Sequence, residues 1–124
     1  MVTLSIEKDK KQTESFFLKA DIPQNENSSC LVAKNKDEIL GYSLFDLDKE
    51  KIIVRYIHPL SDIPLADGIL RSTLHIAAER FVMNAFYADT LPEDFLEKIG
   101  FIKEKNEKRL DIDKLFKSCC SCGK

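Results

Sequence analysis

The stretch IIVRYIHPLSDIPLADGILRSTLHIAAER, residues 52–80, decides how this chain folds. Residues 52–58 are rich in β-branched and aromatic side chains and stop at a proline, a pattern that favours a strand within a sheet. After a proline-containing loop, apolar residues recur at helical spacing from about residue 68 to residue 82, and Asp67 is the predicted N-cap. A strand predicted at 84–89 completes a strand–helix–strand unit, whose right-handed crossover joins two parallel strands.

Shorter elements surround this unit on both sides. They are predicted strands at 2–7, 29–34 and 39–47, predicted helices at 12–20 and 92–100, and last strand material at Ile102 and at 109–115. The strand at 39–47 is apolar on both of its faces, as in a central strand with helices above and below it. The predicted fold class is therefore α/β (α+β), with a mixed, mostly antiparallel sheet and helices on both faces.

Composition places the chain among ordinary globular proteins. It has 124 residues, of which 44% are hydrophobic and 32% charged, and its 19 basic and 21 acidic residues give a net charge of −2. One domain over residues 1–116 accounts for this length, and a cysteine-rich tail at 117–124 is expected to be mobile. The interleaved charges disfavour a nucleic-acid partner, the short apolar runs disfavour a membrane, and the polar N-terminus predicts a cytoplasmic protein.

Two segments carry a resemblance to a known family. The first is the unit at 52–80, and the second is PEDFLEKIGF at 92–101, which is similar to the family's FYEKLGF run. Together with the order of the other elements, they make the chain resemble the GCN5-related N-acetyltransferases (GNAT). The resemblance implies the fold of that family and an acyl-CoA-dependent N-acyltransferase activity. Acetyl-CoA would be the donor, and an amine on a small molecule or on a protein would be the acceptor.

The resemblance also implies where the cofactor binds. In this family a strand, a loop and the first turn of a helix hold acetyl-CoA, because backbone N–H groups and the helix dipole attract the pyrophosphate. The family's loop has Arg or Gln, two residues, Gly, one residue, and then Gly or Ala, and the matching positions here are Ile63, Ala66 and Gly68. The implied cofactor-binding residues are Tyr56, Ile57, His58, Ile63, Ala66, Asp67, Gly68 and Ile69.

Three positions depart from the family's pattern. Ile63 cannot donate a side-chain hydrogen bond, and Asp67 puts a carboxylate near the expected phosphate site. Leu96 occupies the place where the family commonly has a tyrosine that protonates the departing thiolate, so that role is vacant. The catalytic residues are therefore unassigned, and a non-catalytic binding or regulatory module with the same fold is the alternative function.

Several side chains leave alternatives open. His58 is either a general base or a strand-end histidine bonded to backbone or water, and Tyr87 either reaches the substrate cleft or packs in the core. His75 is predicted to be solvated. The acidic pair Glu93 and Asp94 is predicted to stabilise the start of a short helix through its dipole.

The acceptor side and the cysteines raise two further alternatives. The family usually has two helices between its first two strands, whereas this chain has room for about one. Its acceptor site is then either open or completed by another subunit, in a homodimer. A thiol or metal-binding function would use Cys119, Cys120 and Cys122, with Cys30 as a fourth ligand only if the fold brings it close. A structural zinc site usually needs four ligands, so no metal is assigned.

Overall fold

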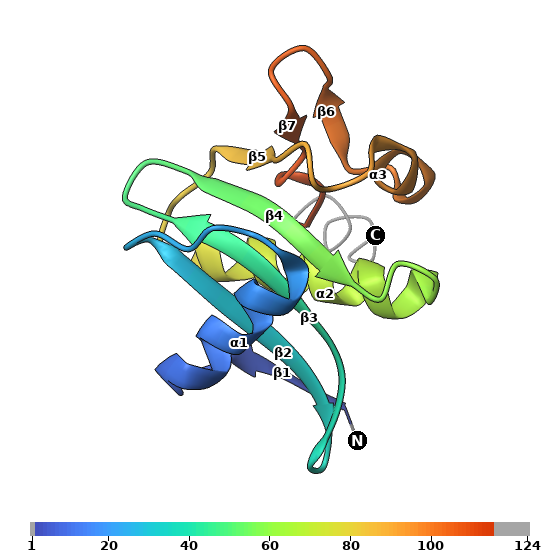
Figure 1. The fold of residues 1–124 in the computed structure, drawn as a ribbon. Helices are drawn as coiled ribbons and strands as arrows, with labels where there is room; N and C mark the ends of the chain where they lie inside the picture. The colour runs from blue at the N-terminus through green and yellow to red at the C-terminus, as the bar shows by residue number, and fades with distance from the viewer. Residues whose placement is uncertain (1, 116–124) are drawn as a thin grey trace.

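One mixed sheet with helices on both faces makes up the part of the chain that the structure describes, residues 2–115 of a computed structural model. In chain order its elements are β1 (Val2–Ile6), α1 (Lys10–Ala20), β2 (Ser28–Asn35), β3 (Glu38–Leu47), β4 (Ile52–His58), α2 (Ile63–Glu79), β5 (Ala85–Tyr87), α3 (Glu93–Ile99), β6 (Ile102–Glu104) and β7 (Arg109–Leu110). The strands follow the order β1-β2-β3-β4-β5-β7-β6 across the sheet. Every neighbouring pair is antiparallel except β4 and β5, which confirms the predicted fold class and the parallel pairing of these two strands (Figure 1).

The two longer helices cover opposite faces of the sheet, as Figure 1 shows. Below α1 lies a small core cluster formed by Phe16, Phe17, Ile22, Cys30, Val32, Tyr42 and Leu44. Strand β3 contributes Tyr42 and Leu44 to this cluster but Phe45 to the larger core under α2, so the prediction of a strand apolar on both faces is confirmed. None of the helices between residues 2 and 115 is long and apolar enough to cross a membrane.

Helix α2 begins five residues earlier than its apolar spacing predicts. Its N-cap is Asp62, whose side chain accepts a hydrogen bond from the Leu65 N–H, so the prediction of Asp67 as N-cap is wrong. Pro64 explains the difference between the predicted and the observed helix start, because a proline in the sequence favours a loop. In the first turn of a helix, however, proline costs little, since its missing N–H would have no partner inside the helix there.

The other end of α2 also differs from the prediction. The helix ends at Glu79, and Phe81, expected among its buried positions, is 91% exposed. Phe81 adopts a left-handed backbone with φ of 62°, which turns the chain out of the helix and points its side chain to solvent. The helical spacing of apolar residues continues to residue 82 in the sequence, whereas the helical backbone ends at Glu79.

The last strand material is shorter than predicted. Residues 102 and 109–115 were expected to extend as strand, whereas β6 and β7 form a small antiparallel pair, with Leu110 opposite Ile102. The remaining residues to 115 fold back in turns, with the Lys114 N–H bonded to the Asp111 carbonyl. Gly100, the predicted C-cap of α3, does have the left-handed conformation, with φ of 74°.

Two close contacts fix α2 against β3. A β-carbon added to Gly41 would lie 2.5 Å from the His58 carbonyl oxygen and 2.9 Å from the Ile69 Cδ1, so glycine is needed for this approach. Further along, the buried hydroxyls of Ser43 and Thr73 are 2.6 Å apart. Because the Thr73 hydroxyl donates its proton to the Ile69 carbonyl at 2.8 Å, Ser43 must be the donor between the two.

Candidate functional site

Strands β4 and β5 separate halfway along β4. Their parallel register runs from Ile52 opposite Ala85 to Val54 opposite Tyr87, and the Ala88 N–H still donates to the Val54 carbonyl at 3.0 Å. The Thr90 hydroxyl then donates to the Arg55 carbonyl, after which the chain turns toward α3. Strand β4 continues alone on this side through residues 56–58 and ends beside the start of α2 (Figure 1).

An irregularity in β4 lies where the two strands separate. Tyr56 is opposite Leu44 and Val54 is opposite Phe45, so Arg55 has no partner of its own in the register with β3. A bulge of this kind bends a strand and re-aims its side chains. The sequence-predicted residues Tyr56, Ile57 and His58 therefore follow directly after the bulge, on the part of β4 that β5 has left.

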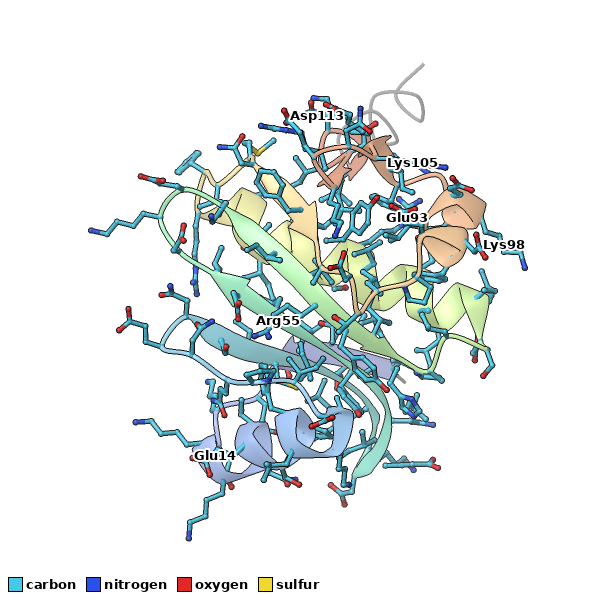
Figure 2. All side chains as sticks on the ribbon, turned by 45° about the horizontal axis from the view of Figure 1, so that its top comes forward. Glu14, Arg55, Glu93, Lys98, Lys105 and Asp113 are labelled. Atoms are coloured by element: carbon cyan, nitrogen blue, oxygen red, sulfur yellow. The ribbon has the colours of Figure 1, made fainter. Side chains whose placement is uncertain are left out.

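Arg55 ties the loop after α1 to the sheet. Its guanidinium donates to the Pro23 carbonyl oxygen at 2.6 Å and lies 3.5 Å from the Asp46 carboxylate of β3 (Figure 2). Asp46 also accepts hydrogen bonds from the Ser28 hydroxyl at 2.7 Å and the Asn25 amide at 3.1 Å. This network was missed in the sequence, because its members lie far apart in the chain and form no local pattern.

Ile57 and His58 point to opposite sides of the sheet. Ile57 is buried in the core under α2, whereas His58 is exposed with its ring centroid 5.4 Å from that of Tyr42. Tyr56 is half-buried on the same side, with its centroid 6.0 Å from that of Tyr42. Burial raises the pKa of the Tyr42 phenol. The structure thus places an aromatic ring, and not a carboxylate, against the His58 ring.

The other five predicted cofactor-binding residues lie in the first two turns of α2, so the residues among them that precede 68 are helical and do not form the predicted loop. Ala66 and Ile69 are completely buried, while Ile63 is half-buried and packs against the main core. The Asp67 carboxylate accepts from the Arg71 guanidinium at 3.1 Å. Gly68 has open space beside it, since a β-carbon there would meet nothing within 4 Å. Their role in cofactor binding stays a prediction.

The N–H groups at the start of α2 are largely bonded within the chain. The Leu65 N–H donates to the Asp62 carboxylate at 3.2 Å, and the Ala66 N–H donates to the Asp62 carbonyl at 2.9 Å. Pro64 has no N–H to offer. Asp62 was missed as a candidate residue, although an aspartate two residues before a proline is a sequence signal for the start of a helix.

Tyr87 packs in the core with its hydroxyl at the edge, as in one of the two predicted alternatives. It is 2% exposed, and its hydroxyl donates to the Glu93 carboxylate at 2.7 Å (Figure 2 labels Glu93). Burial and the hydrogen bond to Glu93 raise the pKa of Tyr87 to about 12. Glu93 thus anchors the start of α3 to β5, in addition to its favourable place in the first turn.

Leu96, at the position where the resemblance implies a general acid in other members, is completely buried in the main core. A leucine side chain holds no transferable proton. This position therefore contributes to core packing and cannot supply the general acid. His75 is exposed, as expected, with its Nε2 3.7 Å from the Glu79 carboxylate.

Cys30 lies in the interior of the described part of the chain. It is completely buried in the cluster under α1, and burial raises the pKa of its thiol to about 12. Across residues 2–115, no three His, Cys, Asp or Glu side chains are grouped so that they could hold a metal ion. The cysteines at 119, 120 and 122 and the predicted tail at 117–124 lie outside the described residues.

Comparison with known proteins adds to this geometry. No protein-family model matches the sequence, and no curated protein matches it significantly. Several solved structures match the fold, among them the following three. Ribosomal-protein-alanine N-acetyltransferase from Brucella melitensis biovar Abortus 2308 has a TM-score of 0.59 at 18% identity, over 80% of this chain and 90% of that one. Ribosomal-protein-S18-alanine N-acetyltransferase from Escherichia coli has a TM-score of 0.57 at 11% identity, over 88% of each chain.

The third is the AtaTR structure bound with acetyl-CoA, which has a TM-score of 0.60 at 14% identity and matches 93% of this chain and 98% of that one. Identities this low speak for the fold alone. The separation of β4 from β5 beside the start of α2, the element order and these matches lead to one conclusion. The chain has the fold of the GCN5-related N-acetyltransferases, at low sequence identity.

Proposed function

We propose that the protein is an N-acyltransferase that moves an acetyl group from acetyl-CoA to an amine. The observation that carries this proposal is the separation of β4 from β5 after Val54, in a fold shared with N-acetyltransferases. Past that point, alternate backbone N–H and C=O groups of β4 face the side that β5 has left. An extended chain of amides, such as the arm that carries the thioester, can bind there as an added strand does.

Acetyl transfer at β4 requires few catalytic side chains. Acetyl-CoA, when bound, supplies the thioester. The amine nitrogen attacks its carbonyl carbon, the C–N bond forms as the C–S bond breaks, and the amine proton ends on the sulfur or in solvent. A backbone N–H of β4 between residues 56 and 58 would stabilise the charge on the carbonyl oxygen, and among side-chain substitutions only proline removes that donor. Holding both reactants in place supplies much of the remaining rate.

The proposal also includes the place where the acceptor amine binds. An amine on a small molecule or on a protein would reach β4 from the face that carries Tyr56 and His58. In the described residues α1 is the one helix between β1 and β2, and the loop that follows it is held to β4 by Arg55. A second copy of the chain would complete the wall of the acceptor site on the open side.

Release of the thiol from acetyl-CoA tests the proposal directly. The wild-type protein should release thiol only when an amine acceptor is present, in a screen of small amines and peptide N-termini. Replacing Tyr56 by alanine should raise the KM for acetyl-CoA about three- to tenfold through lost contact, since an aromatic contact contributes about 1 kcal/mol. Tyr56→Phe, which keeps the ring, is the matched control and should behave as the wild type.

A calorimetric titration separates the two remaining functions. Saturable binding of acetyl-CoA without thiol release for any acceptor would favour the non-catalytic binding module, for which the buried Leu96 is the supporting observation. Absence of both binding at millimolar acetyl-CoA and thiol release would reject the acyltransferase proposal.

A further inference from the structure

The start of α2 is an unsuitable cradle for a diphosphate. In the first helical turn only Ile63 keeps an N–H for an outside anion, because Pro64 has none and Leu65 donates to the Asp62 carboxylate. The next N–H, that of Ala66, is bonded to the Asp62 carbonyl at 2.9 Å. A helix start that binds phosphate normally offers several such donors together.

The charge at the start of α2 also disfavours binding of a diphosphate. The Asp62 side chain is exposed, so it presents a carboxylate at the helix start where a phosphate would have to approach. The nearest cation along α2, Arg71, is already engaged: its guanidinium bonds to Asp67 and lies 5.0 Å from the centre of the Phe101 ring. The carboxylate of Asp62 therefore has no such partner on α2 within the described chain.

The β4 side of the site has the opposite character. Residues 56–58 extend past β5, and their backbone groups are suited to amides and carry no net charge. We propose that this protein recognises the pantetheine arm and thioester of its acyl donor and makes no productive contact with the nucleotide diphosphate. The donor class is then acyl-pantetheine thioesters in general, with acyl-CoA as one member. This inference rests on the proposed acyltransferase function.

Titration of two donors tests the inference on the intact chain. Acetyl-CoA and acetyl-pantetheine share the arm and the thioester, and only the first carries the nucleotide diphosphate. We expect acetyl-CoA to bind no more tightly than acetyl-pantetheine, and up to about tenfold more weakly, since the two donors share the arm contacts and only acetyl-CoA brings a diphosphate near the Asp62 carboxylate. Raising the salt concentration should narrow this difference, because salt screens the repulsion between exposed charges.

Removing the charge of Asp62 gives the sharper comparison. Asp62→Asn keeps an oxygen that caps the Leu65 N–H, so the helix should remain intact. We expect this variant to bind acetyl-CoA about three- to tenfold more tightly, as one fewer repulsive charge allows, and to bind acetyl-pantetheine unchanged. Asp94→Asn, in the exposed first turn of α3, is the matched control and should alter neither affinity.

The outcomes separate this inference from the function on which it rests. Acetyl-CoA binding more than about 30-fold tighter than acetyl-pantetheine, with a marked salt dependence, would overturn the inference and leave the acyltransferase proposal standing. An equal effect of Asp62→Asn on both donors, or no effect on either, would also overturn it. Failure of both donors to bind would overturn the proposed function together with the inference.

Discussion

The two ends of helix α2 solve the same problem with different residues. At the start, the Asp62 side chain and carbonyl accept the N–H groups of Leu65 and Ala66. At the other end, the Phe81 N–H donates to the Ala78 carbonyl at 3.0 Å and the Val82 N–H to the Ala77 carbonyl at 2.9 Å, the pattern known as a Schellman motif. At both ends, backbone groups that the helix itself leaves unpaired find partners within the chain.

The difference lies in how well each residue suits its place. Aspartate is among the best N-cap residues, whereas the left-handed position of a Schellman motif is usually a glycine and here is Phe81. The strain is therefore at the end of α2 away from β4's open side. At the start of α2, which borders that side, Asp62 satisfies the N–H groups of Leu65 and Ala66 without a ligand.

The largest expected effect comes from disturbing the packed start of the helix. Gly41→Ala should lower the free energy of unfolding by about 3 kcal/mol, since its β-carbon would lie 2.5 Å from the His58 carbonyl oxygen. Chemical denaturation would measure this. Gly68→Ala is the control inside α2, where open space and better helix propensity should raise stability by about 1 kcal/mol. Equal effects of the two substitutions would contradict the close approach of β3 to the helix start.

Removing the N-cap should have the next largest effect. Asp62→Ala should lower the free energy of unfolding by about 1 kcal/mol, because the Leu65 N–H loses its acceptor. Thermal unfolding of Asp62→Ala beside Asp62→Asn checks the reason, since asparagine caps as well as aspartate does. A helix start at residue 68 would leave both variants as stable as the wild type.

The smallest effect, and the only stabilising one at a helix end, is expected at Phe81. Phe81→Gly should raise the free energy of unfolding by about 0.5 kcal/mol, because glycine adopts the left-handed backbone without strain but is freer in the unfolded chain. Phe81→Ala removes the exposed ring yet keeps the strain, so it should change little. If alanine stabilised the protein as much as glycine, exposure of the ring, and not the backbone, would be the cause.

Much of the fold could be predicted because its signals are local. The strand at 39–47 showed apolar residues on both faces, and the structure divides them between two cores. Gly100 could be assigned as a C-cap from its place after an apolar helix. Each of these patterns lies within a single helix or strand, so it can be recognised without knowing how the elements pack together.

The site was less predictable because it depends on relations between elements. No residue of β4 or β5 signals that their pairing stops after Val54, and the bonds of Arg55 to Pro23 and Asp46 join distant parts of the chain. The predicted helix start is wrong for a different reason: a proline such as Pro64 occurs both in loops and in the first turn of a helix, and the residues around it do not distinguish the two. Ile63, Ala66 and Asp67, predicted in a loop, therefore lie in the helix.

The hydroxyl pair of Ser43 and Thr73 sets where α2 lies along its own axis. Apolar packing alone is tolerant of sliding, because one side chain replaces another of similar size. If α2 moved by one turn, about 5.4 Å, Ile69 or Ala77 would face Ser43 in place of Thr73. Neither side chain can accept the hydrogen bond that the Ser43 hydroxyl donates, and a buried hydroxyl left without a partner costs about 1–3 kcal/mol. Two small polar groups in the interior therefore act as a stop that holds the helix start in place relative to β4.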